Sequence, residues 1–110
     1  SAGILLSSQD YENSKKIYEN IILSKNKFYS NLALNVMIEQ KLEKNKEKLL
    51  NYFKIVESLD YSQDQKDLIL FKKALFLINI QMVNEGEDIL KNLIKSNSKI
   101  KSLAEEITKN

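Results

Sequence analysis

Apolar residues recur along this chain at spacings of three and four, and polar stretches interrupt them at six places. These breaks fall at residues 7–9, 24–27, 43–45, 60–64, 84–86 and 97–98. An apolar residue at every third or fourth position places a continuous stripe on one face of an α-helix. The pattern therefore predicts an all-α chain of about six helices with no β-strand.

The predicted helices are of two kinds. The first, third and fifth carry their apolar residues on one face, so we expect them to lie on the outside. The second, around residues 32–38, and the fourth, around residues 68–82, are apolar on nearly every side, which is typical of helices buried by several neighbours. We expect the segment from Phe71 to Ile78 to be the most buried, with Phe76 enclosed.

One phrase, a polar turn followed by an apolar stripe, occurs three times. Its copies span residues 9–21, 44–56 and 84–94. When they are aligned on Ser14, Leu49 and Ile89, corresponding positions lie 35 and 40 residues apart. Repeats of this length with a helix on each side of a turn form stacked helix hairpins. We expect residues 1–110 to form a single domain of this kind.

Turn residues at three breaks are suited to cap the helices that follow. Ser62 with Gln65, and Asn84 with Glu87, match the capping box, in which each side chain satisfies a free backbone N–H. Asn45 can cap the third helix in the same way. These residues predict where the third, fourth and fifth helices begin.

Composition argues against several classes of function. The chain has 17 lysines and 15 acidic residues but no Arg, His or Cys. Without the planar guanidinium of Arg, nucleic-acid recognition is not expected. Without imidazole and thiolate, we predict no metal site, no cofactor and no catalytic residues. The lysine-rich run at residues 41–48 also contains Glu43 and Glu47, so it is expected to be a solvated helix face.

The N-terminus suggests a piece of a longer protein. The chain opens on Ser1-Ala2-Gly3 without Met, and no stretch approaches the ~20 apolar residues of a membrane-spanning helix. We expect an incomplete first hairpin and, upstream of it, room for a membrane anchor. The unpaired apolar stripe of the first helix favours a dimer.

Residues 10–18 resemble the tetratricopeptide repeat, whose second helix follows a turn and presents a small residue and, four positions later, an aromatic one. Ser14 and Tyr18 occupy these positions here. Leu49 and Ile89 are bulkier than the family prefers, and the customary Trp, Gly and Tyr of the first helix are missing. The resemblance implies a right-handed stack of helix hairpins, a tetratricopeptide-like (TPR-like) α-solenoid.

A narrower resemblance covers residues 10–106. It rests on four landmarks in order: Phe28 to Ala33, Lys44-Asn45, Asp67-Leu68 and Leu103 to Glu106. Together they look like the periplasmic repeat domain of the ancillary subunit of the bacterial SecYEG translocon and its alphaproteobacterial relatives. This resemblance implies an N-terminal inner-membrane helix followed by a periplasmic domain that associates with translocon and chaperone components. It supplies no catalytic motif.

A candidate protein-binding groove follows from the same register, because the first helices of tetratricopeptide hairpins line a concave surface. Its residues would be Asn31, Leu34, Ile38 and Lys41 from one repeat and Phe71, Ala74, Ile78 and Gln81 from the next. An apolar groove with polar ends suits an amphipathic helix or an extended peptide. Alternatively, the last helix or a helix outside this chain fills the groove, and the same residues are core.

Two functions remain open. The first is a scaffold that binds proteins or peptides and that, by resemblance, assists protein translocation or assembly at the periplasmic side of the bacterial inner membrane. The second is a structural module whose apolar faces join copies of the chain to one another. Neither function requires a cofactor or a nucleic acid.

Overall fold

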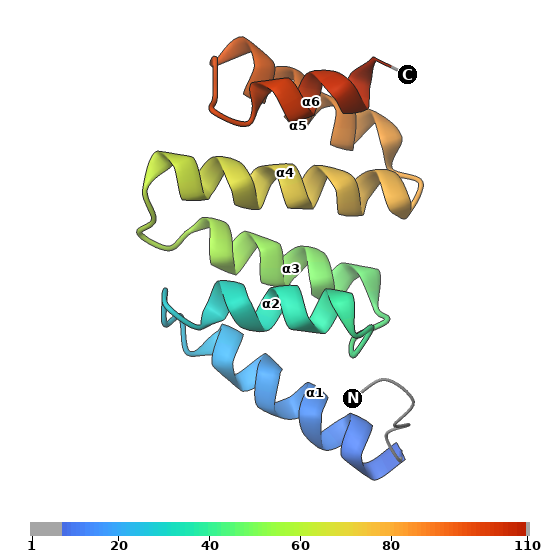
Figure 1. The fold of residues 1–110 in the computed structure, drawn as a ribbon. Coiled ribbons are helices and arrows are strands. Elements are labelled where there is room, and N and C mark those ends of the chain that lie inside the picture. The colour runs from blue at the N-terminus through green and yellow to red at the C-terminus, as the bar shows by residue number, and fades with distance from the viewer. Residues whose placement is uncertain (1–7, 110) are drawn as a thin grey trace. The chain divides into compact units, whose positions relative to one another are not determined.

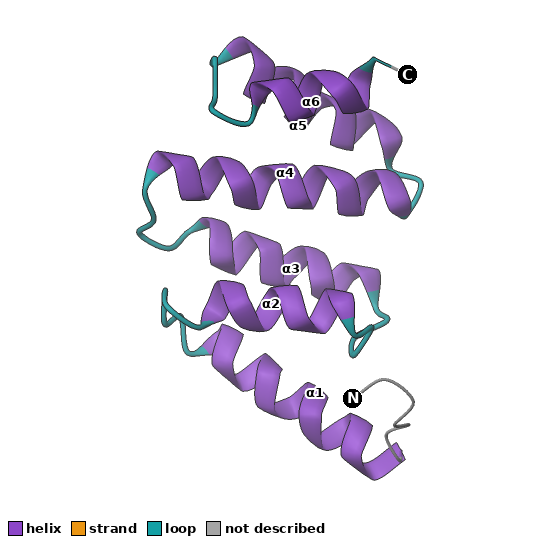
Figure 2. Ribbon diagram, viewed as in Figure 1, coloured by secondary structure: helices purple, strands orange, loops and turns teal. Residues whose placement is uncertain are grey.

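The structure, a computed structural model, describes residues 8–109, in which α-helices are joined by short loops and turns (Figure 2). The helices are α1 (Ser8–Leu23), α2 (Ser30–Glu39), α3 (Lys46–Glu57), α4 (Gln63–Asn79), α5 (Val83–Lys95) and α6 (Lys101–Thr108). No strand occurs within the described range, and the predicted all-α class with six helices is confirmed. None of these helices is both long and apolar enough to cross a membrane.

The helices fall into two compact units. Unit 1 ends at Leu59 and contains α1, α2 and α3, and unit 2 begins at Asp60 and contains α4, α5 and α6 (Figure 1). In unit 1, each helix contacts the other two. In unit 2, α5 contacts both α4 and α6. The single domain expected for residues 1–110 stays a prediction. The incomplete first hairpin expected at the N-terminus involves residues before Ser8, which lie outside the described range.

The core of unit 1 is formed by all three of its helices. Its buried apolar residues are Ile22, Ala33, Leu34, Met37, Leu42, Leu49, Tyr52, Phe53 and Val56. The third helix was expected to carry its apolar residues on one face, and it supplies four of these core residues, Leu49, Tyr52, Phe53 and Val56. The second was expected to be buried on nearly every side, yet Leu32 is 59% exposed. Leu32 lies on the side of α2 opposite the positions that pack inward. Because α2 contacts only two other helices in unit 1, neither of them covers that side.

The core of unit 2 centres on two alanines and two leucines. Ala74, Leu90, Leu93 and Ala104 are buried together. The expectation that Phe76 is enclosed is wrong, because its side chain is only partly buried, and the neighbouring Leu75 is 38% exposed. Ala74 lies on the side of α4 that faces the core of unit 2. Phe76 is two positions further along the helix, which places it on a different side of α4.

Gly86 allows α4 and α5 to approach closely. It is buried in the first turns of α5, and a Cβ atom placed on it would lie 2.8 Å from the carbonyl oxygen of Ala74. The same Cβ would lie 2.8 Å from Cγ1 of Ile78. Both distances are well below van der Waals contact, so only glycine fits at this position.

Two of the three predicted caps are present. The backbone N–H of Lys48 donates to Oδ1 of Asn45 at 3.1 Å, and that of Gln65 donates to Oγ of Ser62 at 3.3 Å. The predicted cap at Asn84 is wrong, because α5 begins earlier, at Val83, with no side-chain cap. The tight packing of α4 against α5 at Gly86 requires helical backbone at a position that the sequence assigned to a turn.

Candidate functional site

A polar cluster lies between α1 and α3 in unit 1, and we define it as Lys15, Glu19, Glu43, Lys48 and Tyr52. At its centre, the carboxylate of Glu43 is buried, with the residue only 5% exposed. Its Oε1 atom lies 3.5 Å from Nζ of Lys15 and 3.9 Å from Nζ of Lys48. The solvated face expected around Glu43 is therefore wrong at that residue. A buried carboxylate is tolerated only when it is paired, and two helices supply the pairing charges.

The second half of the cluster joins α3 to α1 through a tyrosine. The Tyr52 hydroxyl donates a hydrogen bond to Oε2 of Glu19, and the tyrosine side chain is buried. Burial raises the pKa of the Tyr52 phenol, and the hydrogen bond to Glu19 and the negative charges of Glu19 and Glu43 raise it further. In the folded state, the Tyr52 phenol therefore stays neutral at pH values well above those at which a tyrosine ordinarily ionises.

We predict that Tyr52→Phe changes the response of stability to alkaline pH. At pH 8 the variant should lose about 0.5–1.5 kcal/mol, the net value of one hydrogen bond. Because the folded-state pKa is raised, the neutral phenol stabilises the fold below the unfolded pKa of about 10, and this contribution is lost as the pH rises above it. The wild type and the variant should therefore converge above pH 10 in urea titrations followed by circular dichroism.

The matched control is Tyr29→Phe, which removes a hydroxyl from a side chain that is 60% exposed. Its stability should stay within about 0.5 kcal/mol of wild type at each pH. Parallel pH curves for wild type and Tyr52→Phe would contradict the assignment of the raised pKa to Tyr52.

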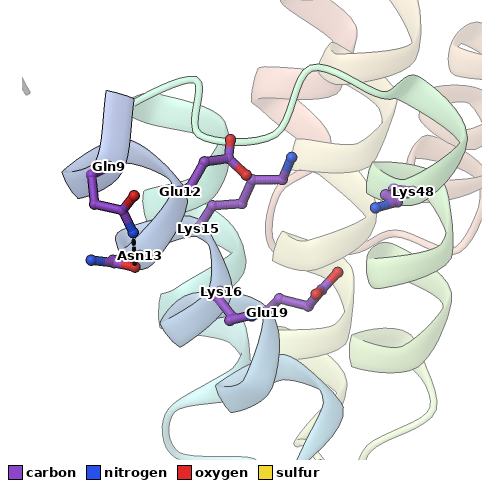
Figure 3. A pocket seen from close by; sticks show the side chains of 7 residues that line it. All are labelled: Gln9, Glu12, Asn13, Lys15, Lys16, Glu19 and Lys48. Carbon is purple, nitrogen blue, oxygen red and sulfur yellow. Dashed lines mark hydrogen bonds between the residues drawn. The ribbon is translucent and has the colours of Figure 1, made fainter. Parts of the chain in front are cut away.

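A polar hollow of about 290 Å³ adjoins the cluster. Figure 3 shows the α1 side chains that line it, with Lys48 facing them from α3; the lining residues are Gln9, Glu12, Asn13, Lys15, Lys16, Glu19 and Lys48. Three ammonium groups, two carboxylates and two amide side chains line this wall. Among residues 8–109, no three His, Cys, Asp or Glu side chains come together as a metal site would require.

The first four residues of the predicted groove lie on or just after α2. Leu34 is buried in the core of unit 1, whereas Asn31 and Ile38 are partly buried. Lys41 lies beyond the end of α2 with a φ angle of 53°, and its carbonyl oxygen accepts a hydrogen bond from the Tyr11 hydroxyl. The side chain of Lys41 is exposed.

The other four residues lie in unit 2. Ala74 is completely buried, and Phe71 and Ile78 pack against the same core cluster. Gln81 is exposed and follows α4 with a φ angle of 71°. The positions of Leu34, Ala74, Phe71 and Ile78 match the interpretation in which these residues serve as core. The groove itself stays a prediction, because its two halves belong to separate units.

Sequence reasoning missed two features that the structure makes plain. One is the buried carboxylate of Glu43, which gives no signal in the sequence because lysines surround it. The other is a group of exposed apolar residues around the α1–α2 turn, where Phe28 is 77% exposed. Its one signal in the sequence is a pair of adjacent aromatic residues, Phe28 and Tyr29, directly after a polar break.

Comparisons with protein-family models, with curated proteins and with solved structures were made for this chain. None gave a match. They offer no support for the resemblance to the translocon subunit, which stays a proposal. Function therefore has to be inferred from the geometry of the two units.

Proposed function

We propose that this chain is a protein-interaction scaffold of the TPR-like type, in which helix hairpins present side chains to a protein or peptide. The observation that carries the proposal is a helix ending that recurs after 40 residues. Lys41 and Gln81 both follow a helix in the left-handed conformation. Beside them, the N–H of Leu42 donates to the carbonyl of Met37 at 2.9 Å, and the N–H of Met82 donates to that of Leu77 at 2.8 Å.

This recurrence supports a repeat because it links equivalent elements. In each case a helix ends in a left-handed residue and the chain reverses into a second helix, α2 into α3 and α4 into α5. Lys25 and Asn97 adopt the same conformation after α1 and α5, so the left-handed residue alone does not mark a repeat. What recurs after 40 residues is the whole turn that joins two helices in contact, from Met37 to Leu42 and from Leu77 to Met82. Repeated helix hairpins are widely used as binding scaffolds.

The resemblance to the translocon subunit, noted in the sequence, would also specify where in the cell the scaffold acts. A domain of this kind, anchored by an upstream helix, would assist protein translocation or assembly at the periplasmic side of the bacterial inner membrane. Its partners would be translocon or envelope chaperone components. This part of the proposal rests on the resemblance alone.

The binding test uses residues 1–110 and a panel of amphipathic helical and extended peptides. Binding should shift the NMR amide signals of α2 and α4 near Ile38 and Ile78, and Ile38→Glu should abolish it. The control is Ile17→Glu, which places the same charge at a position that is 58% exposed and outside the predicted groove. Unchanged binding by the Ile38→Glu variant would contradict the groove.

Folding must be measured alongside binding, because a charge at a core position unfolds a domain. If Ile38→Glu lowers the melting temperature sharply while Ile17→Glu does not, Ile38 is core. In that case Ile38→Ala distinguishes core packing from peptide contact. If Ile38 contacts the peptide, this variant should bind the peptide more weakly while its NMR spectrum remains that of the folded protein.

Self-association is the second candidate, and it is favoured by the outer face of α6. Leu103 and Ile107 lie one helical turn apart and are 55% and 41% exposed. A second copy covering this face would protect both residues from water. Sedimentation at several protein concentrations distinguishes the two functions, because a scaffold stays monomeric whereas a self-association module forms larger species as the concentration rises.

A further inference from the structure

The turn between α1 and α2 is a rigid structure held by one asparagine. Oδ1 of Asn26 accepts hydrogen bonds from the backbone N–H groups of Phe28 at 2.8 Å and Tyr29 at 3.2 Å. The carbonyl of Asn26 accepts the N–H of Ser30 at 2.8 Å, and Oγ of Ser30 donates to the carbonyl of Ile21 at 3.0 Å. These bonds fix the backbone of the turn before any partner binds.

This rigid turn holds large apolar side chains in water. Phe28 is 77% exposed, Tyr29 is 60% exposed and Leu32 is 59% exposed. Leu32 lies in the first turn of α2, and Phe28 and Tyr29 immediately precede that helix, so all three exposed residues occur where α2 begins. Leu23, at the end of α1, is 50% exposed on the other side of the turn. An exposed apolar group on an ordered backbone is typical of an interaction surface.

The charge of this region differs from that of the rest of the chain. Between Glu19 and Glu39 there is no acidic residue, and the two charged side chains are Lys25 and Lys27. The remaining chain has 15 lysines and 15 acidic residues, so the entire net charge of +2 belongs to this region. Both lysines are exposed, and Nζ of Lys27 lies 5.8 Å from the centre of the Phe28 ring.

We propose that the α1–α2 turn is a contact site for an anionic lipid surface. In this arrangement Phe28, Tyr29 and Leu32 enter the boundary between headgroups and acyl chains, where aromatic side chains are favoured. Lys25 and Lys27 remain at the level of the lipid phosphates and are attracted by their negative charge. Charge complementarity favours a lipid surface of this sign, since the segment between Glu19 and Glu39 carries two lysines and no carboxylate of its own.

The absence of tryptophan from the chain makes a direct test possible. Phe28→Trp introduces a single indole at the proposed site, and Leu103→Trp introduces one at an exposed apolar position in unit 2. On vesicles of phosphatidylcholine and phosphatidylglycerol, the emission of the Phe28→Trp variant should shift to the blue and be quenched by brominated lipid chains. The emission of the Leu103→Trp variant should change much less.

The charge requirement is tested in the Phe28→Trp background. Neutralising both turn lysines, with Lys25→Gln and Lys27→Gln, should lower the vesicle partition coefficient by roughly 30-fold. The matched control, Lys91→Gln with Lys95→Gln, removes the same charge from exposed positions on α5 and should leave partitioning nearly unchanged. Raising the salt concentration should weaken vesicle binding of the Phe28→Trp variant that keeps both turn lysines. It should not restore binding of the variant in which they are neutralised.

Three outcomes would overturn the proposal. One is the absence of any blue shift on anionic vesicles, and another is an equal response from Phe28→Trp and Leu103→Trp, which would indicate general adsorption. The third is a blue shift that grows with protein concentration without vesicles, which would assign the surface to a second copy of the chain. Because no peptide is used, failure here leaves the scaffold proposal intact, and failure of peptide binding leaves this one intact.

Discussion

Replacing Phe53 with alanine is expected to lower the free energy of unfolding of unit 1 by about 3–5 kcal/mol. Phe53 is only 2% exposed and lies among core residues from all three helices of unit 1. Truncation to Cβ would remove a large apolar surface and leave a cavity that the surrounding helices cannot fill completely. Small domains are stable by only about 5–15 kcal/mol, so this loss would remove a large fraction of the total stability. Urea titration followed by circular dichroism measures the loss.

The same chain offers a matched control in Phe28→Ala. Phe28 is 77% exposed, so its truncation should change the free energy of unfolding by less than about 0.5 kcal/mol. A loss below about 1 kcal/mol for Phe53→Ala would show that α3 does not form the centre of the unit 1 core.

Gly86→Ala is expected to destabilise unit 2 by about 1–3 kcal/mol, although alanine is the better helix former. Helix propensity alone would favour the variant by about 1 kcal/mol. The added methyl group would meet the Ala74 carbonyl oxygen at 2.8 Å, and a backbone atom cannot turn away as a flexible side chain can. The helices α4 and α5 must therefore move apart, and overpacking of this kind costs more than propensity returns.

Thermal unfolding of Gly86→Ala should be compared with that of Glu85→Ala, an exposed neighbour in the same helical turn. Glu85→Ala should change stability by less than about 0.5 kcal/mol. An increase in melting temperature for Gly86→Ala would mean that α4 and α5 are farther apart than the structure places them.

The order and type of the helices could be predicted from the sequence because those properties are local. The spacing of apolar residues selects a helix within a few turns, and a side chain such as Asn45 or Ser62 caps the backbone N–H three residues later. The cap expected at Asn84 failed for a reason that is not local. Packing against Ala74 draws the segment around Gly86 into α5.

The candidate sites depended far more on tertiary structure. Lys15, Glu43 and Lys48 come together from α1, a loop and α3, and no spacing in the sequence relates them. The groove was predicted from a register carried over by resemblance, and the structure buries Leu34 and Ala74 within their own units. The exposure of Phe28 and Tyr29 in the α1–α2 turn could not be predicted, because an apolar pattern does not state whether a neighbouring helix covers it.

The sequence by itself determined that this chain is all-α, that its helices are separated by polar breaks and that no His or Cys is present for metal or nucleophilic chemistry. Only the tertiary structure decided that Phe53 rather than Phe76 is enclosed, that Glu43 is buried between two lysines and that Phe28 remains in water. The physical reason is that helix formation depends on residues three and four apart, whereas burial depends on which helices pack against each face.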